Sequence, residues 1–362
     1  MELNKPFKLF ANCIAVKGAN RSTICDLQRN EVKLIPNDLC LILKKYQGKT
    51  INAVKEIYRN EFDSTIEEYF NFLLKNEFIF FTDTPEIFPA LSPEWNDPSS
   101  INNAILDFSK NSQYELEKVI DQLNELNCRH LEIRFYDSVR PSKIEKILKH
   151  IDFIKSSILS VDIIFSFSDK ITDQSIQNLL RNHIRIASIK VFNADKNKYV
   201  PPVRNRMGYL VYCMENISSH LHCGIISKDF FVVNTKLYTE SLHHNSCLNR
   251  KISIDVDGNI KNCPSLSQNF GNIKDTSLSA ALRHPEFKKY WSIAKDEITT
   301  CKDCEFRYIC TDCRAYLENP DDKYAKPLKC GYNPYTNKWE QWSKNKLNKK
   351  AIEFYRLHEI IN

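Results

Sequence analysis

The sequence predicts an α/β protein in three parts: an N-terminal winged-helix domain (residues 1–83), a partial βα barrel (residues 100–240) and a cysteine-rich domain (residues 241–362). Three observations support this prediction. Strand-like and helical segments alternate through the middle of the chain, which is typical of a parallel sheet. The first 82 residues combine strand patterns with three helical patterns. Seven of the 13 cysteines are clustered in the last third.

The N-terminal domain is expected to contain two strands, three helices and a wing-like strand. FKLFANCIAV and STICDLQRNEVKLI are rich in β-branched and aromatic residues. Pro36 opens a helical pattern that Gly48 ends, and Thr50 caps the next one. TIEEYFNFLLKNEF then spaces its apolar residues at helical intervals, and FIFFTD follows as the wing. Four prolines make residues 84–99 an extended connector.

The middle of the chain repeats a strand–helix rhythm. AILDFS, HLEIRFY, VDIIFSFS and ASIKVFNA are the strands, and helical patterns separate them. Beyond residue 200 we expect YLVYCM, HLHCGII and DFFVVN to be strands as well. His220 and His222 alternate in the second of these, so they would share one face and are weak site candidates.

Composition excludes several classes of function. Seven glycines in 362 residues form neither of the two glycine-rich nucleotide-binding motifs. Apolar runs are far shorter than the roughly 20 residues of a spanning helix. The start of the chain lacks a signal-peptide pattern, so we expect a cytoplasmic protein with free or metal-bound thiols and no membrane partner. The net charge of +6 is spread among acidic residues, so nucleic acid is not an expected partner.

The spacing of the last seven cysteines is the strongest pattern in the chain. It reads C-x15-C, then C-x2-C-x5-C-x2-C, then x16-C. Two thiolates in C-x2-C can chelate one metal, and a tetrahedral zinc site uses four ligands. One zinc site therefore leaves three of these residues unexplained. They are Cys247, Cys263, Cys301, Cys304, Cys310, Cys313 and Cys330.

The stretches CLNRKISIDVDGNIKNCPS, CKDCEFRYICTDC and CGYNPYTNKWE together resemble a SPASM domain, the C-terminal module of radical-SAM peptide maturases. The resemblance implies one or two auxiliary [4Fe-4S] clusters held by thiolates. It assigns one cluster, here cluster II, to Cys301, Cys304, Cys310 and Cys330. The other, cluster I, takes Cys247, Cys263 and Cys313. Its fourth position is open or filled by His243, His244, Cys213 or Cys223.

The spacing departs from the family at one point, because Cys310-x2-Cys313 is one residue shorter than usual. An alternative therefore stays open. Cys301, Cys304, Cys310 and Cys313 would form a closed zinc knuckle, with the other three cysteines unassigned.

The sequence lacks the C-x3-C-x2-C motif of radical-SAM enzymes. KNSQYELEKV follows the first barrel strand without a cysteine, and RFYDSVRPSKIEKIL replaces the Gly-Gly-Glu-Pro-type turn after the second. The whole resembles the degenerate radical-SAM-like proteins of grasp-with-spasm peptide-maturation systems. This implies no S-adenosylmethionine, an ATP-grasp ligase and a precursor peptide as partners, and no independent catalytic role in this chain.

The N-terminal domain is similar to the leader-recognition elements of peptide maturases, in which a leader peptide adds as a strand to a sheet edge. The predicted edge strand is Ser22, Thr23, Ile24, Cys25 and Asp26, and the helix Thr65–Asn76 would pack on the leader. The alternative for this domain is a purely structural winged helix.

Two other functions remain open. In the first, cluster I has an open iron and performs redox or Lewis-acid chemistry on a peptide. In the second, the chain is a metal-binding winged-helix transcription factor. The helix Thr65–Asn76 argues against the second, because it carries one basic residue, Lys75, and two glutamates.

Overall fold

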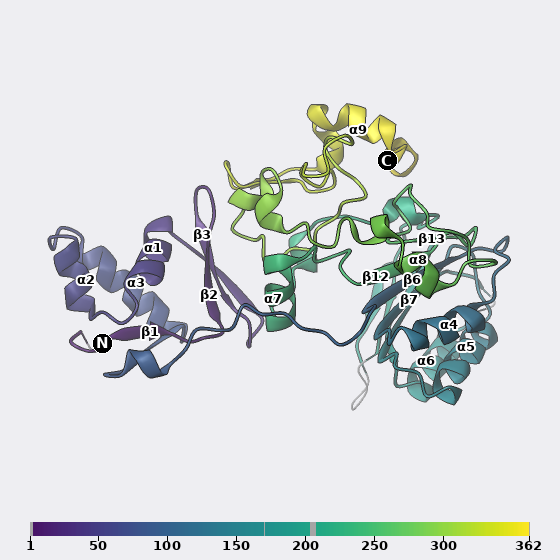
Figure 1. Cartoon of the computed structure of the whole chain (residues 1–362), viewed down its shortest axis with the longest axis horizontal. Helices are drawn as coiled ribbons and strands as arrows, with labels where there is room; N and C mark the ends of the chain where they lie inside the picture. Colours follow the sequence, from purple (N-terminus) through teal and green to yellow (C-terminus); the bar gives the residue numbers. More distant parts are fainter. Residues whose placement is uncertain (1–2, 170, 203–207, 362) are drawn as a thin grey trace.

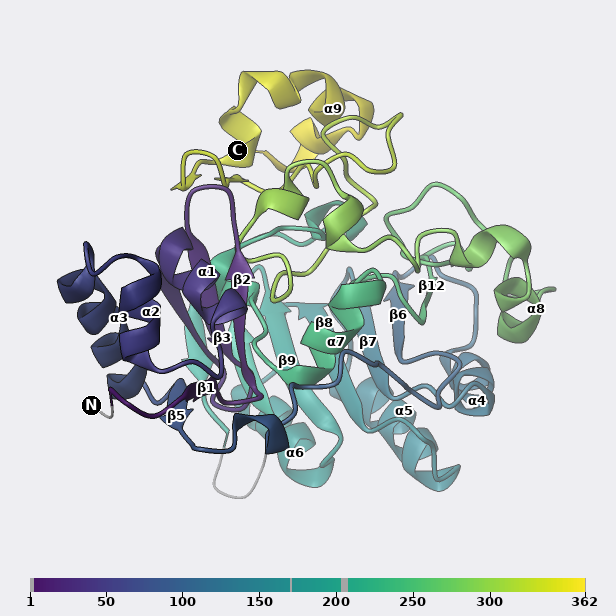
Figure 2. The same cartoon turned by 60° about the vertical axis from the view of Figure 1, so that its left-hand side comes forward.

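The computed structural model describes residues 3–169, 171–202 and 208–361. An N-terminal domain and a central α/β domain lie at opposite ends of the molecule, and the C-terminal third of the chain contacts both (Figure 1). Figure 2 shows the last segment, with its short terminal helix, on the opposite side of the molecule from the helices of the central domain. In the described part of the chain, no helix combines the length and apolar character needed to cross a membrane.

The N-terminal domain contains five strands and three helices. Strands β2, β3 and β4 form an antiparallel sheet with β3 in the centre, and β1 pairs with β5. The elements are β1 Phe7–Leu9, β2 Cys13–Lys17, β3 Ser22–Asp26, β4 Glu31–Ile35, α1 Asn37–Lys45, α2 Ile51–Ile57, α3 Asp63–Lys75 and β5 Ile79–Phe81.

The prediction of two long strands before the helices is wrong, because each of them is two strands separated by a turn. The second turn has a local cause. The Asp26 carboxylate accepts hydrogen bonds from the backbone N–H groups of Gln28 and Arg29, at 3.0 and 2.9 Å. Such an Asx turn reverses the chain. The predicted cap of α2 is confirmed, since Thr50 Oγ1 accepts a hydrogen bond from the backbone N–H of Ala53.

The sheet β2–β3–β4 is covered on both faces. Ile24 and Ile35 pack with the helices α1–α3 on one face. On the other face Cys25 packs with Phe306 and Tyr332 of the cysteine-rich region. This arrangement places the N-terminal sheet between its own helices and the C-terminal third of the chain.

The central domain is an open eight-stranded sheet in the order β10-β11-β9-β8-β7-β6-β12-β13. The strands from β11 to β12 are parallel, and β10 and β13 are antiparallel additions at the two ends. Strand β12 comes from the cysteine-rich segment, so the sheet extends beyond residues 100–240. The strands are β6 Asn103–Phe108, β7 His130–Phe135, β8 Ser160–Ser166, β9 Ile186–Phe192, β10 Lys198–Val200, β11 Tyr209–Tyr212, β12 Lys251–Ile254 and β13 Ile260–Lys261.

Three helices cover one face of this sheet (Figure 1): α4 Leu116–Glu125, α5 Pro141–Phe153 and α6 Asp173–Asn182. Alternate strand residues such as Leu131, Val161 and Ile163 are buried on that face. The residues between them point to the opposite face, which is polar. There Asp107 pairs in register with Arg134 in one row. The next row contains Glu132, Asp162 and Ser188.

The remainder is mostly irregular and contains short elements: α7 Thr235–His243, α8 Leu278–Leu282, β14 Tyr332–Asn333, β15 Lys338–Trp339 and α9 Lys349–Phe354. The prediction of strands in HLHCGII and DFFVVN is wrong. Both segments contain 3-10 turns, at His220–His222 and Lys228–Phe230. Ser219 and Ser227 cap these turns by accepting hydrogen bonds from backbone N–H groups two residues ahead, which draws the chain away from an extended strand.

Candidate iron–sulfur centres

The thiols predicted for cluster II lie close enough to influence one another. Burial raises the pKa of Cys301 to about 12, with contributions from the neighbouring charges of Cys330 and Cys310. Burial likewise raises the pKa of Cys310 to about 11, and Cys330 adds to the rise. The pKa of Cys304 is raised by burial and also by Cys310 and Cys301. These four thiols therefore form one group.

The thiols predicted for cluster I form a second group, which includes a fourth cysteine. Burial raises the pKa of Cys313 to about 12, and the charges of Cys247 and Cys223 add to it. The pKa of Cys263 is raised by burial and then by Cys223, Cys247 and Cys313. The pKa of Cys247 is likewise raised by burial and by the charge of Cys223. Cys223 thus accompanies the three predicted ligands.

The backbone beside Cys223 supports this placement independently. Gly224 has φ of +82°, and a Cβ built on it would lie 2.9 Å from the Sγ of Cys313. Only glycine adopts this conformation without strain and allows so close an approach. The chain after the His220–His222 turn is therefore pressed against a cluster I thiol.

The other three candidates for the fourth position are not among the main charges that act on the thiols of Cys247, Cys263 and Cys313. Cys213 follows β11, where its neighbouring charges are Lys190 and Glu215. The ring of His244 packs edge-on against Trp95, with the ring centroids 5.2 Å apart. His243 is the last residue of α7. Sequence position alone did not separate Cys223 from these residues.

The charge interactions among the thiols count against the zinc-knuckle alternative. A zinc knuckle would hold Cys301, Cys304, Cys310 and Cys313 around one ion, with each sulfur about 2.3 Å from the metal. The charges that add to the raised pKa of Cys313 are instead those of Cys247 and Cys223.

Each group of thiols has a lysine within reach of one sulfur. The Nζ of Lys251 lies 3.3 Å from the Sγ of Cys247. The Nζ of Lys295 lies 3.6 Å from the Sγ of Cys310, and Lys295 is 3% exposed. A cation next to a cysteine favours the thiolate, which is the form that binds metal. The sequence contains no pattern that distinguishes these two lysines from the other lysines of the chain.

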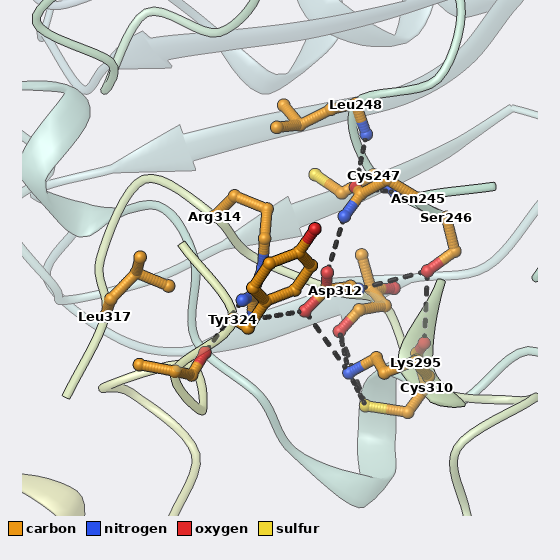
Figure 3. Close-up of polar contacts among 12 residues, drawn as sticks. Asn245, Ser246, Cys247, Leu248, Lys295, Cys310, Asp312, Arg314, Leu317 and Tyr324 are labelled. Carbon is orange, nitrogen blue, oxygen red and sulfur yellow. Dashed lines mark hydrogen bonds and ion pairs between the residues drawn. The ribbon is translucent and has the colours of Figure 1, made fainter. Parts of the chain in front are cut away.

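A polar network connects the two groups of cysteines (Figure 3). The fully buried carboxylate of Asp312 forms ion pairs with Arg314 at 2.8 Å and with Lys295 at 3.5 Å. It also accepts a hydrogen bond from the side-chain amide of Asn245. The amide oxygen of Asn245 in turn accepts from the backbone N–H of Cys247, at 3.1 Å. One buried carboxylate thus connects Lys295, which lies next to Cys310, to the backbone of Cys247 in the other group of thiols.

The polar face of the central sheet contributes a buried charge pair whose electrostatic surroundings include Cys223. The Nε of Arg134 lies 2.6 Å from Asp107, which also accepts a hydrogen bond from Tyr136. The pKa of Arg134 is raised although burial lowers it, because Asp107 and, to a smaller extent, Cys223 stabilise the cation. The Nη2 of Arg134 is buried, and no acceptor among the described residues bonds to it. An iron–sulfur cluster, which carries acceptor sulfurs, fits a site of four thiols and an unpaired donor.

The loops after β6 and β7 line an open pocket of about 370 Å³. Lys110, Asp137 and Arg140 are among its lining residues, and its lining includes no cysteine. The backbone N–H of Lys110 donates a hydrogen bond to the Asp137 carboxylate at 2.8 Å, which connects the two loops.

Comparison with known proteins gives one family match and several distant structures. No curated protein matches the chain. Among solved structures, BtrN in an open conformation is 13% identical with a TM-score of 0.31, covering 56% of this chain and 92% of that chain. Streptococcus suis SuiB bound to S-adenosylmethionine is 12% identical with a TM-score of 0.34, and the match covers 89% of this chain and 98% of that chain. SuiB bound to its precursor peptide SuiA is 12% identical with a TM-score of 0.29, and the match covers 88% of this chain and 98% of that chain.

The family match concerns the cysteine-rich region. Residues 246–305 match the SPASM model, described as an iron–sulfur cluster-binding domain. The matched range includes Cys247, Cys263, Cys301 and Cys304, two from each group of thiols. The chain therefore carries a SPASM iron–sulfur cluster-binding domain.

Proposed function

We propose that this protein holds two [4Fe-4S] clusters and acts in the maturation of a ribosomally made peptide without cleaving S-adenosylmethionine. The observation that carries the proposal is the division of eight cysteines into two groups of four within and around a SPASM domain. A [4Fe-4S] cluster takes four thiolate ligands, so each group matches one cluster. Cluster I would be held by Cys223, Cys247, Cys263 and Cys313, and cluster II by Cys301, Cys304, Cys310 and Cys330.

Four protein ligands on cluster I would leave no iron open to substrate. This favours a structural or electron-transferring role over direct Lewis-acid chemistry on the peptide. When bound, the clusters supply one-electron redox capacity and additional folding energy, since metal binding stabilises only the folded state. Four of the eight proposed ligands are shielded from water by the surrounding residues, because Cys263, Cys301, Cys310 and Cys313 are each at most 7% exposed.

The N-terminal sheet offers an edge for a leader peptide, but it is a different edge from the predicted one. The prediction of Ser22–Asp26 as an edge strand is wrong, because β3 pairs with β2 on one side and β4 on the other. Its five residues, Ser22, Thr23, Ile24, Cys25 and Asp26, are all buried. A sheet strand with both edges paired cannot accept another strand.

The better candidate is β4, which is mostly exposed and, among the described strands, pairs with β3 alone. Leu34 in β4 is 50% exposed. Leu34 is in register with Thr23, whose hydroxyl donates to the backbone carbonyl of Glu305 at 2.8 Å, next to Cys304. A peptide added to β4 would therefore extend the sheet that packs on the cluster II region, with affinity supplied by main-chain hydrogen bonds.

An ATP-grasp ligase is proposed as the partner that forms the new bonds. The support is the resemblance of the sequence to grasp-with-spasm proteins and the cysteine-free loops after β6 and β7. In this arrangement the chain binds and presents the precursor, and the ligase performs the chemistry.

The decisive experiment is anaerobic purification of the full chain with analysis of iron, sulfide and zinc. About eight irons and eight sulfides per chain support two clusters, and about four support one. Zinc without labile sulfide would reject the iron–sulfur assignment. Binding of a candidate precursor peptide, measured by fluorescence anisotropy, then tests the peptide-binding role separately.

A further inference from the structure

We propose that Lys295 and Lys251 are positioning residues that set the reduction potentials of cluster II and cluster I, one lysine for each cluster. The proposal rests on the proposed function, since it requires both clusters. It goes beyond that function because it makes the two clusters separately tuned redox centres.

Lys295 is held in place by its surroundings. Its Nζ lies 3.6 Å from the Sγ of Cys310, 3.5 Å from the Oδ1 of Asp312 and 3.5 Å from the backbone carbonyl of Thr311. Lys295 and Asp312 are 3% and 0% exposed. A lysine with a buried carboxylate on one side and a thiolate on the other keeps its proton and points a donor at the sulfur.

Lys251 occupies the matching position at cluster I. Its Nζ lies 3.3 Å from the Sγ of Cys247. It lies at the start of β12, in register with Asn103 of β6, so the central sheet fixes its backbone. Cluster I thus takes its donor from the central sheet, while cluster II takes its donor from a 3-10 turn at Lys295–Glu297.

A cluster gains one negative charge when it accepts an electron. A cation and hydrogen-bond donor at a ligating sulfur stabilises that reduced form more than the oxidised form, and hydrogen bonds to sulfur and net charge are established determinants of cluster potential. Removing either lysine should therefore make its own cluster harder to reduce. The other cluster should be affected much less, because its sulfurs have their own donor.

Asp312 makes the two sites interdependent. It pairs with Lys295 directly and holds Asn245, which accepts from the backbone N–H of Cys247 (Figure 3). The same carboxylate that orients the donor of cluster II therefore also fixes the chain at a ligand of cluster I. Displacing it would disturb both clusters, whereas each lysine acts on one.

The test is an anaerobic dithionite titration of the full chain, followed by electron paramagnetic resonance of the reduced clusters. The variants are Lys295→Met and Lys251→Met, with Lys302→Met as the control. Lys302 is exposed and adjacent to Cys301, so its substitution removes a positive charge near cluster II without removing a sulfur contact. At a fixed potential, Lys295→Met should lower the reduced-to-oxidised ratio of one cluster about tenfold, which equals 59 mV for one electron. Lys251→Met should do the same to the other cluster.

Iron and sulfide analysis of each variant separates the possible failures. Wild-type protein without iron and sulfide would remove the proposed function itself. If the wild type holds both clusters but neither lysine substitution changes a reduction potential, this proposal alone is overturned. A shift in Lys302→Met as large as that in Lys295→Met would also overturn it. If Lys295→Met fails to assemble, Lys295→Gln retains a donor without the charge and should give a smaller shift in the same direction. Loss of cluster II iron in both variants would make Lys295 a structural residue and overturn the proposal.

Discussion

The guanidinium of Arg134 in β7 lies 2.6 Å from the carboxylate of Asp107 in β6, and the two residues are 5% and 1% exposed. This ion pair lies on the polar face of the central sheet, away from α4–α6. Because Cys223 contributes to the charge environment of Arg134, the pair connects the sheet to the surroundings of cluster I.

Removing the cation of this pair should destabilise the protein strongly. Arg134→Met leaves the Asp107 carboxylate buried with only its hydrogen bond from Tyr136, and breaking a buried pair costs about 3–5 kcal/mol. Urea unfolding under anaerobic conditions measures this loss. Arg140→Met, on an exposed loop residue, should change stability by less than about 0.5 kcal/mol. Equal midpoints for the two variants would show that the pair contributes little.

Cys223 should be required for cluster I, and Cys213 should not. Cys223→Ser removes one of the four grouped thiols, so iron retained after gel filtration should fall from about eight toward about four per chain. Cys213→Ser changes a partly buried thiol after β11 and should retain the wild-type iron content. Full iron content in Cys223→Ser would return cluster I to a three-cysteine site with an open iron.

Acidification should destabilise the protein partly through His220. Burial lowers the pKa of His220 to about 4, and Lys261 and Arg134 add to the effect. The folded state thus holds a neutral imidazole, whereas the unfolded chain binds a proton near pH 6.5. The stability is fully present above pH 6.5 and falls by about 2–3 kcal/mol as pH decreases to 4.

His220→Gln should flatten this part of the pH profile of unfolding free energy, because glutamine does not titrate. His358→Gln, which alters an exposed histidine near the C-terminus, is the matched control and should keep the wild-type slope. Identical slopes in all three proteins would assign the acid sensitivity to other groups.

The exposed edge of the N-terminal sheet should control peptide binding. Leu34→Asp places a charge on β4, and losing the burial of one leucine costs about 1.5–3 kcal/mol, so affinity for the precursor peptide should fall at least tenfold. Leu41→Asp in α1 is a close control, since Leu41 and Leu34 are 49% and 50% exposed. Fluorescence anisotropy with a labelled precursor peptide compares the two. A larger loss in Leu41→Asp would place the binding site on the helices.

The sequence by itself determined the features that depend on neighbouring residues. Thr50 caps α2 because its hydroxyl lies within reach of an N–H three residues ahead. The strands β6 to β9 were predictable because alternate residues face the helices. The assignment of the cysteines to two clusters was implied by the family resemblance, and it stays a prediction.

Only the tertiary structure decided the features that join distant parts of the chain. Strand β3 became central because β2 and β4 pair with it from both sides, which no local pattern reports. Cys223 joins Cys313 across 90 residues through the close approach of Gly224. Lys251 and Lys295 gain their importance from their position next to a sulfur, and Lys295 is also buried. Pairing, close approach and desolvation are properties of residues brought together by folding, so they are absent from any short stretch of sequence.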